Sequence, residues 1–416
     1  MKQISINDVV ELLKQEKNFI NAFGVAIEYE KTNKMSLSTS IKKLLYQLLK
    51  ENELEYSISE DSRCFAFYDI ENYRKDHVTS FKKVLETIEN SDFICSLPNR
   101  TQRNVVDIVK LIMSTTQFIK IPQIKKMKLR QRVYYLVYWF KLVKFLNYIK
   151  VCNFSQYEAV VVYFDAEICS NVLVQMCKEQ GIKTATLQHG IFVSPKENPR
   201  NIDECSIEFK YSVSDYFLAW SDFIKNEAIK AGMDEKKIKV LGIPKFIGEK
   251  TDVQFTPRNC FGVILGWIEN DFENKKLIEV ANEIARKNNM KYVVKYHPSF
   301  RGNEYAHLID TALCQGNVSK EKNVVEYIKD VKFSIVGNSS LFVELLYFGH
   351  RTFHLHINGM PDKYNNITQL SFSNTTQFEK VLEESTVSFG KLQKYLCGPR
   401  DVDNEYKVFF KELLLK

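Results

Sequence analysis

The feature that most constrains the fold is an alternation of short apolar runs and helical stretches that begins at residue 158. The run EAVVVYFD (158–165) is apolar and β-branched, which is typical of a buried strand in a parallel sheet. Residues 167–180 have helical periodicity, and Gly181 stands where a helix C-terminal cap is expected. A second strand-like run, KTATLQHG (183–190), follows. Because strand–helix–strand crossovers are right-handed, this unit predicts two parallel strands.

The same alternation continues to residue 356 and is interrupted once. Strands are predicted at 215–220 and 237–244, with a helix between them at 221–232. Residues 245–259 have the composition of a linker. After it, the pattern predicts strands at 260–267, 291–298, 333–338 and 351–356, and helices at 274–289, 324–330 and 339–349. The sequence therefore predicts an α/β protein with two successive doubly wound domains.

The two ends of the chain carry weaker patterns. In the first 150 residues, strand-like runs at 23–27, 64–68 and 93–97 are separated by charged, helical stretches. The closing residues 403–416 have the pattern of a helix. We expect one domain over residues 1–248 and a second over 256–395. Residues 396–416 are expected to form a terminal helix that packs back on the first domain.

The composition is that of a folded protein in a reducing compartment. Hydrophobic residues make up 45% of the 416 residues and aromatic residues 13%, which excludes a disordered chain. No window reaches the ~18 uninterrupted apolar residues of a membrane-spanning helix, and the N-terminus lacks the apolar segment of a signal peptide. The nine cysteines are scattered and form no CxxC pair, which argues against a zinc ribbon or a disulfide framework. We expect a cytoplasmic protein with reduced thiols.

Residues 120–150 form a basic and aromatic segment. They hold nine Lys and Arg residues, no acidic residue and seven aromatic residues. A helix of this kind suits the surface of an anionic membrane. The alternative is a partly buried helix with a solvated basic edge, whose aromatic residues belong to the core. Nucleic acid is a disfavoured partner, because no recognition motif accompanies the charge.

Polar residues follow two strands of the first predicted domain. Asp165 and Glu167 come directly after one strand, and Gln188 and His189 close the next. In parallel sheets, ligands bind beyond the carboxyl ends of the strands. Imidazole is suited to take a proton from a hydroxyl near neutral pH, and Gly190 allows close approach of a backbone. A carboxylate could orient the imidazole or be the base itself. Alternatively, His189 has a structural role and merely forms a hydrogen bond with the backbone of its turn.

The second predicted domain places polar residues in the same way. Lys295 and His297 alternate at the end of one strand and so point to the same face. Asn338, Ser339 and Ser340 stand where the next strand turns into a helix, whose first-turn N–H groups receive a phosphate well. Glu344 lies one helical turn beyond Ser340 and could accept hydrogen bonds from a ribose. Alternatively, the serine is an N-cap and the glutamate is solvated.

Four motifs together resemble bacterial GT-B glycosyltransferases of capsule and surface-polysaccharide assembly. These motifs are LQHG (187–190), KYHP (295–298), GNSS…E…FG (337–349) and VLGIP (240–244). The group includes sialyl- and Kdo-transferases and the teichoic-acid CDP-glycerol glycerophosphotransferases. The resemblance spans roughly residues 158–360.

The resemblance implies a GT-B fold, with two Rossmann-like domains that face each other across a cleft. The second domain would bind a nucleotide donor, and the first would bind the acceptor near His189, Asp165 and Glu167. Gln188 and Gly190 would line the acceptor side. No metal and no cofactor are expected. The donor-binding residues implied by the resemblance are Lys295, His297, Ser339, Ser340, Glu344, Asn338 and Gly266.

The resulting hypothesis is an inverting, metal-independent glycosyltransferase. It would move a sugar from a CMP-, CDP- or UDP-linked donor to a glycan or lipid-linked acceptor of a capsule or cell surface. Segment 120–150 would hold it on the inner face of the membrane. The teichoic-acid enzymes carry tryptophan where Gln188 stands, which favours sugar transfer over polyol-phosphate transfer. The alternatives are a CDP-polyol phosphotransferase of teichoic-acid type, a nucleotide-sugar 2-epimerase and a non-catalytic scaffold of capsule assembly.

Overall fold

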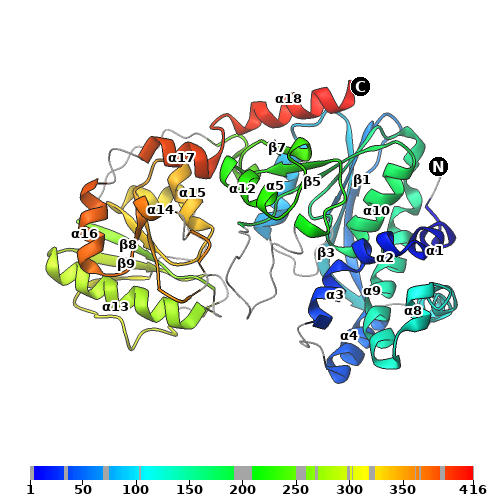
Figure 1. Cartoon of the computed structure of the whole chain (residues 1–416), viewed down its shortest axis with the longest axis horizontal. Helices are drawn as coiled ribbons and strands as arrows, with labels where there is room; N and C mark the ends of the chain where they lie inside the picture. Colours follow the sequence, from blue (N-terminus) through cyan, green and yellow to red (C-terminus); the bar gives the residue numbers. More distant parts are fainter. Residues whose placement is uncertain are drawn as a thin grey trace. The chain divides into compact units, whose positions relative to one another are not determined.

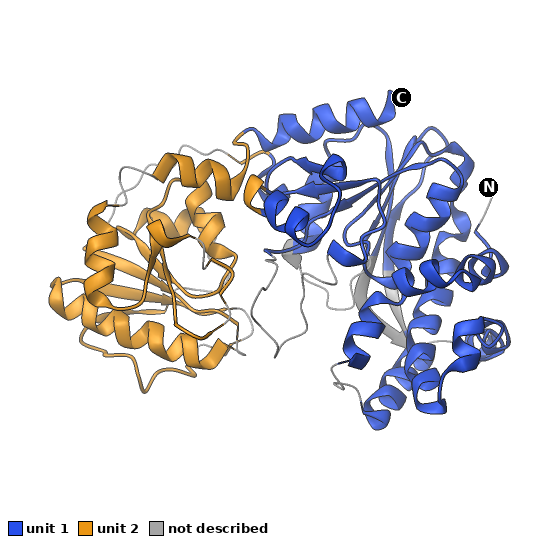
Figure 2. Ribbon diagram, in the orientation of Figure 1, with its two compact units in different colours: residues 1–220, 224–247, 401–416 blue, residues 221–223, 248–400 orange. Residues whose placement is uncertain are grey.

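The computed structural model describes the chain in two compact units, each of which holds one mainly parallel sheet (Figure 1). The first comprises residues 1–220, 224–247 and 401–416, and the second residues 221–223 and 248–400 (Figure 2). The predicted boundaries were 1–248 and 256–395. The described residues are 4–31, 36–68, 75–102, 105–191, 209–249, 259–267, 270–297, 300–301, 303–317, 324–360, 362–364, 367–384 and 389–415.

The sheet of the first unit has seven strands in the order β1-β3-β2-β4-β5-β6-β7. The strands β2 to β7 pair in parallel, and β1 runs antiparallel to β3 at one edge. Every residue of β4 is buried, as its β-branched run predicted. The strands are β1 (Lys50–Ser57), β2 (Cys64–Tyr68), β3 (Ser91–Gln102), β4 (Ala159–Val162), β5 (Lys183–Leu187), β6 (Tyr216–Ala219) and β7 (Ile238–Val240).

One predicted strand of this unit is wrong. The run 23–27 is helical, because α3 begins at Gly24. Phe23 and Ala26 are buried at a helical spacing, and the ring of Phe23 stacks on that of Phe19 one turn earlier, at 4.6 Å between centroids. Gly24 is required here, since a Cβ on it would lie 2.4 Å from the ring of Tyr211. Five apolar residues fit a strand or a helix turn equally well, and packing decides between them.

Helices cover the sheet of the first unit. The main core cluster joins the side chains of α1, α2, α9 and α10 to those of β2 and β4. The helices are α1 (Ile6–Lys14), α2 (Glu16–Ala22), α3 (Gly24–Lys31), α4 (Leu37–Leu49), α5 (Lys75–Leu85), α6 (Val105–Met113), α7 (Thr115–Phe118), α8 (Pro122–Lys126), α9 (Leu129–Tyr148), α10 (Ile168–Glu179), α12 (Asp222–Lys230) and α18 (Val402–Leu414), with 3₁₀ turns η1 (Ile149–Val151), η2 (Phe154–Gln156), η3 (Glu235–Lys237) and η4 (Pro244–Phe246).

The terminal helix α18 packs within the first unit, although it follows the second unit in the sequence (Figure 2). The Tyr406 hydroxyl donates to the Gly242 carbonyl at 3.4 Å. The ring of Phe409 meets that of Tyr216 edge-on, with centroids 5.5 Å apart.

The aromatic residues of segment 120–150 lie mostly in the core. The segment forms α8 and α9. Trp139 is fully buried, and its indole N–H donates to the carbonyl and the hydroxyl of Ser114. Five of the seven aromatic residues are buried: Tyr134, Tyr135, Trp139, Phe140 and Phe145. This agrees with the alternative in which the aromatic side chains belong to the core and only the basic edge is solvated.

The sheet of the second unit has six strands in the order β10-β9-β8-β11-β12-β13, all parallel. Its predicted strands and helices are all present. The strands are β8 (Cys260–Ile264), β9 (Lys291–Lys295), β10 (Cys314–Asn317), β11 (Ser334–Val336), β12 (Thr352–Leu355) and β13 (Ser371–Phe372), and the helices are α13 (Asp271–Lys287), α14 (Val324–Lys329), α15 (Leu341–Tyr347), η6 (Thr368–Leu370), α16 (Thr375–Glu384) and α17 (Phe389–Cys397).

Candidate functional site

In the first unit, the predicted residues gather where β4 and β5 end. Gln188 follows β5 directly and is 1% exposed. Its amide nitrogen donates to the Gly190 carbonyl at 2.5 Å, and its amide oxygen accepts from the Trp220 main-chain N–H at 2.7 Å. The Trp220 indole N–H donates to the Gln188 carbonyl at 3.1 Å. Gln188 therefore ties the turn that carries His189 to the end of the neighbouring strand β6.

His189 lies half-buried among aromatic rings. Its imidazole is 4.2 Å from the ring of Phe164 and 6.3 Å from that of Tyr163, measured between centroids. Rings on these sides fix the plane of the imidazole, while the remaining exposure leaves it open to a ligand.

A second imidazole, His77, faces the same place. Its ring centroid is 5.2 Å from that of Tyr163 and 6.3 Å from that of His189. His77 lies in the first turn of α5, in the part of the chain where no motif was recognised. The signal that could have found it is topological. It comes shortly after β2, which pairs with β4, so this segment begins at the same edge of the sheet as Tyr163.

Asp165 is buried and holds a loop. It is 1% exposed, and one of its carboxylate oxygens accepts from the Ser212 hydroxyl and from the N–H groups of Val213 and Ser214, at 3.0, 2.8 and 2.8 Å. Burial raises the pKa of this carboxyl, and those hydrogen bonds oppose the rise. The carboxylate organises residues 212–214, a contact that no sequence pattern indicated.

Glu167 stands at the N-cap position of α10 and pairs with Lys141 of α9 at 3.2 Å. Both side chains are largely shielded from solvent. The described structure thus directs Glu167 toward α9.

In the second unit, the end of β8 is joined to α13. The Asn274 side chain is fully buried, and its oxygen accepts from the Gly266 N–H at 2.8 Å. A Cβ on Gly266 would lie 2.9 Å from the amide nitrogen of Asn270. Trp267, the next residue, is half-exposed. Gly266 therefore lets the chain pass close over the start of α13.

Glu273 is a buried carboxyl that sequence reasoning missed. One oxygen accepts from the Asn338 N–H at 3.1 Å. The other is buried without a hydrogen-bond partner among the described residues. Burial raises the pKa of Glu273 to about 7, and the nearby Asp362 adds to the rise. A Cβ on Gly337 would lie 2.8 Å from the carboxyl carbon, so glycine is needed for this approach. The helical period of α13 did not predict that the carboxyl of Glu273 is buried.

Ser339 and Ser340 lie at the start of α15, as predicted. The Ser339 hydroxyl accepts from the Leu341 N–H at 3.3 Å, and its carbonyl accepts from the Tyr364 hydroxyl at 2.9 Å. Ser340 is the N-cap residue, and its side chain makes no capping hydrogen bond. Both serines are partly exposed. Glu344 lies one turn further on and is 8% exposed.

Lys295 and His297 lie at the end of β9, which pairs with β8. Lys295 is its last residue and is 8% exposed, while His297 is half-buried. The His297 carbonyl accepts from the Phe300 N–H at 3.0 Å and so closes a turn. Pro298 lies outside the described residues.

A histidine pair next to Asn338 was also missed. The Asp362 carboxylate contacts His356 at 2.6 Å and His354 at 3.4 Å. The following N–H, of Lys363, donates to the Asn338 side chain at 2.9 Å. Burial lowers the pKa of His354 to about 4, so this imidazole is neutral at neutral pH. The sequence HLH (354–356) indicates only the end of a strand. The loop that brings Asp362 back to this strand carries no motif that would predict the contact.

The described residues contain no group of three or more His, Cys, Asp or Glu side chains placed to hold a metal ion. They also include no helix long and apolar enough to cross a membrane. The expectation of a metal-independent protein stays a prediction.

The sequence matches no protein-family model and no curated protein. The structure resembles a UDP co-structure of MnaA from S. aureus, with 9% identity, a TM-score of 0.54, and coverage of 85% of this chain and 98% of that one. It also resembles the UDP-GlcNAc 2-epimerase of Methanocaldococcus jannaschii in complex with UDP-GlcNAc and UDP, with 14% identity, a TM-score of 0.52, and coverage of 85% and 99%. The wall teichoic acid polymerase TagF aligns over 95% of this chain and 98% of that one with 12% identity. Its TM-score of 0.47 is too low to support an inference. These likenesses show the fold alone, and it is the predicted GT-B fold.

Proposed function

We propose that this protein is a nucleotide-sugar-dependent enzyme, and specifically an inverting glycosyltransferase that needs no metal. The observation that carries the proposal is His189. It is a half-exposed imidazole at the carboxyl end of a central parallel strand, set among aromatic rings on a turn that Gln188 ties down. Ligands of doubly wound sheets bind at such strand ends.

In the proposed reaction, His189 is the general base. It takes the proton of an acceptor hydroxyl, the hydroxyl oxygen attacks the anomeric carbon of the donor sugar, and the bond from that carbon to the phosphate oxygen breaks. A single displacement of this kind inverts the anomeric configuration. Asp165 and Glu167 were the alternative bases. We favour His189 because one carboxylate oxygen of Asp165 accepts three hydrogen bonds and Glu167 is paired with Lys141.

The second unit is proposed to hold the donor. His297, Ser339 and Ser340 would donate hydrogen bonds to the phosphates, with Lys295 as a nearby cation, and would stabilise the departing nucleotide. Glu344 would accept from the ribose. Gly266 and Asn338 follow β8 and β11, which pair directly, so both residues are proposed to lie beside the same ligand. No cofactor is proposed.

The donor is proposed to be a uridine or cytidine nucleotide. A uridine nucleotide is the first to test, because both solved structures with a TM-score above 0.5 named here are of complexes with UDP. The acceptor is proposed to be a growing capsule or cell-surface glycan, free or lipid-linked. The protein would then work in the cytoplasm at the inner face of the membrane, where its basic segment 120–150 contributes to attachment.

A nucleotide-sugar 2-epimerase is the second candidate, and the similarity to the Methanocaldococcus jannaschii enzyme favours it. An epimerase changes the donor in the absence of any acceptor. Incubation with UDP-GlcNAc alone, followed by NMR of the sugar, would show the epimer for this candidate and unchanged donor for the transferase.

Binding and transfer test the main proposal in two steps. A thermal-shift screen against CMP, CDP, UDP and GDP identifies the base, because a ligand that binds the native state stabilises it by mass action. Sugar donors of that base are then offered with glycan acceptors. A CDP-polyol phosphotransferase would instead respond to CDP-glycerol or CDP-ribitol. If no nucleotide shifts the midpoint, and if alanine at His189 and His297 leaves the host polysaccharide unchanged, the scaffold role replaces the enzyme.

A further inference from the structure

Helix α4 has apolar side chains toward solvent as well as toward the core, where Leu44 and Leu48 pack partly buried. Its fully buried positions are polar: Ser40 and the side chain of Gln47, which accepts from the buried Lys144 amine of α9 at 2.8 Å. A globular protein normally directs the apolar stripe of a helix inward. Here the apolar side chains left 43–50% exposed recur every four residues, at Leu37, Ile41, Leu45 and Leu49.

Helix α6 shows the same excess of exposed apolar surface. It contacts α4, and both helices contact α9. Leu111 is its one fully buried residue. The apolar side chains of α6 that remain 47–74% exposed are Val105, Val106, Val109, Ile112 and Met113. We call these nine exposed residues of α4 and α6 the apolar face. Exposed apolar groups of this extent mark a surface that is covered by something else.

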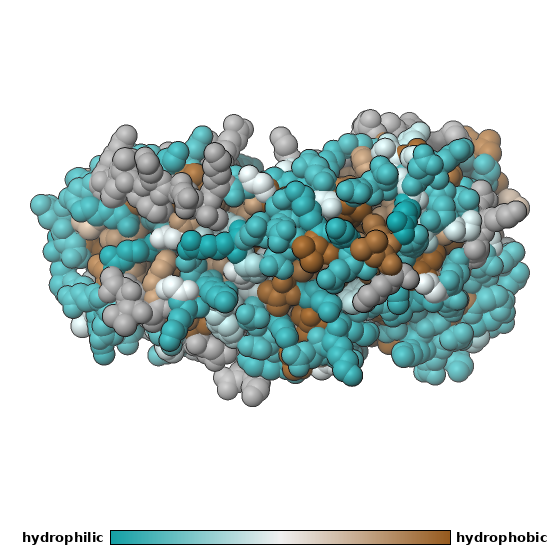
Figure 3. Space-filling model, turned by 90° about the horizontal axis from the view of Figure 1, so that it is seen from above, coloured by the Kyte–Doolittle hydropathy of each residue, from teal (hydrophilic) through white to brown (hydrophobic). Residues whose placement is uncertain are grey.

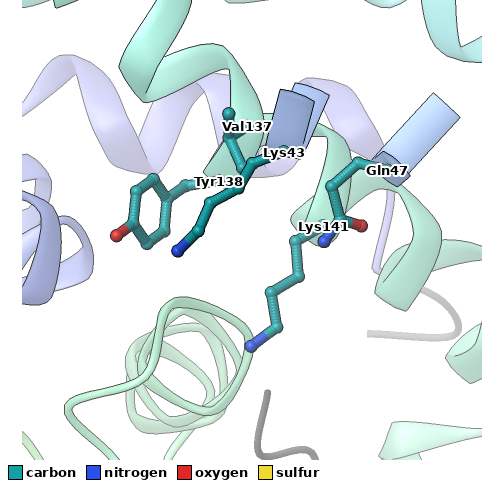
Figure 4. A pocket seen from close by; sticks show the side chains of 5 residues that line it. All are labelled: Lys43, Gln47, Val137, Tyr138 and Lys141. Carbon is teal, nitrogen blue, oxygen red and sulfur yellow. The ribbon is translucent and has the colours of Figure 1, made fainter. Parts of the chain in front are cut away.

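From within α6 onward, the chain is strongly basic. Residues 108–157 hold ten Lys and Arg residues and no Asp or Glu. Lys141 and Lys144 are used inside the unit, by Glu167 and Gln47. Lys120, Lys125, Lys126 and Lys128 are exposed, and none of them has an ion pair among the described residues. Figure 4 shows the hollow between α4 and α9, which Lys43, Gln47, Tyr138 and Lys141 line and where the Lys43 amine lies beside the ring of Tyr138.

We propose that the apolar face of α4 and α6 inserts shallowly into an anionic lipid surface, while the lysines around α8 draw the protein to it. Helices α4 and α6 hold one acidic residue, Asp107, which is paired with Lys110. Their exposed apolar side chains, beside clustered cations, match the two parts of such a surface: acyl chains and anionic headgroups. This assigns insertion to residues 37–49 and 105–113 and leaves segment 120–150 the charges alone, since most of its aromatic side chains are buried.

A second copy of the chain is the other occupant that an apolar face could have. The charge argues against it, because two copies of a segment with ten cations and no acid would repel each other if the faces met symmetrically. A lipid surface supplies the missing anions.

The experiment is co-sedimentation of the full chain with vesicles of phosphatidylcholine alone or mixed with phosphatidylglycerol, without nucleotide or acceptor. The wild-type chain is expected to bind the anionic vesicles, to bind phosphatidylcholine vesicles at least about tenfold more weakly, and to detach partly at high salt. The double variant Ile41→Ser/Leu45→Ser should weaken binding by about tenfold. About half of each apolar side chain is exposed and would be buried in the lipid, and serine removes this apolar area. Lys125→Glu/Lys126→Glu should weaken it by about thirtyfold or more.

Matched controls separate the face from general effects. Val408→Ser/Leu415→Ser changes two exposed apolar residues at the other side of the unit, on α18 and just after it (Figure 1), and Lys236→Glu/Lys237→Glu reverses another adjacent lysine pair. Both controls should bind as the wild type does, and all variants should keep its thermal midpoint because the changed residues are not buried.

The proposal is overturned if the wild type ignores anionic vesicles, if the controls lose as much binding as the face variants, or if the face variants bind undiminished. It is also overturned if Ile41→Ser/Leu45→Ser turns a dimer into a monomer in sedimentation velocity while vesicle binding is absent. Vesicle binding requires no reaction, so its failure leaves the proposed transferase activity untouched, and an inactive enzyme that still binds vesicles leaves this inference standing.

Discussion

Single side chains decide what the two strand ends can do. His189 and Asp165 both follow buried strands and look alike in the sequence. The structure separates them: the imidazole is half-exposed among rings, and the carboxylate is sealed by the backbone of residues 212–214. The sequence shows that a polar residue follows a strand, but a distant segment decides whether that residue faces solvent.

Replacing His189 by alanine tests the proposed base. Transfer to the acceptor should fall by about 10²–10⁴ in kcat, the usual contribution of general-base catalysis, with little change in donor binding. Steady-state kinetics and nucleotide thermal shift measure the two effects. His307→Ala changes an exposed histidine and serves as control. Equal activity of the two variants would remove His189 from the mechanism.

Glu273 predicts an unusual dependence of stability on pH. Its pKa rises from an ordinary 4.5 to about 7 on folding, so between these values the unfolded chain is ionised at this site while the folded chain is still protonated. The carboxyl therefore stabilises the fold at low pH, and this contribution is lost as the pH rises through 7.

Glu273→Gln should consequently match the wild type near pH 4.5 and exceed it at pH 8 by up to about 3 kcal/mol. The amide still accepts from the Asn338 N–H. Urea unfolding at several pH values measures the difference in free energy of unfolding between the two chains. The buried histidines are the same in both chains, so their contribution cancels in this difference. Glu279→Gln, an exposed carboxylate on the same helix, should show no such trend. A parallel pH course for wild type and Glu273→Gln would contradict the assigned burial.

At the scale of elements, long patterned segments were predictable and short ones were not. β4, α10 and β5 follow from an apolar run, a helical period and a capping glycine, and Gly181 indeed has φ +76°. β10 has the sequence CQGN and β13 has two residues, so neither carries a strand signal. The wrong strand at 23–27 and the missed His77 fall in the region where only tertiary contacts set the outcome.

Gly24→Ala tests the packing that turned this run into a helix. The added methyl group meets the ring of Tyr211, whose hydroxyl donates to Glu28 at 2.5 Å one turn further along α3. Overpacking of this kind costs about 1–3 kcal/mol, even though alanine favours helix. Urea unfolding measures the change. Gly390→Ala, in α17 with open space around it, should be neutral or slightly stabilising. If Gly24→Ala were equally neutral, the close approach would be wrong.

At the scale of the whole molecule, the proposal assigns nucleotide binding to one unit. A saturating uridine nucleotide should slow hydrogen exchange in residues 265–267 and 337–341 of the second unit and leave β4 and β5 of the first unit unchanged. Exchange mass spectrometry resolves these peptides, and adenosine monophosphate at the same concentration serves as control. Protection confined to the first unit would reverse the assignment of donor and acceptor.

The GT-B fold was predictable because the same alternation of strands and helices occurs in both halves of the chain. Each occurrence makes the α/β assignment of the other half more secure. The extent of the first unit was less accessible, since its contacts with α18 join residues some 160 positions apart, such as Tyr406 and Gly242.

The return of α18 to the first unit has a consequence for biosynthesis. Residues 248–400 leave the ribosome as one uninterrupted stretch and can fold as they emerge, whereas the earlier unit has to wait for Val402–Leu414. Until then the surface that Tyr406 and Phe409 contact, at Gly242 and Tyr216, stays uncovered and accessible to chaperones. A stop codon at position 401 would thus damage the part of the protein that was translated first.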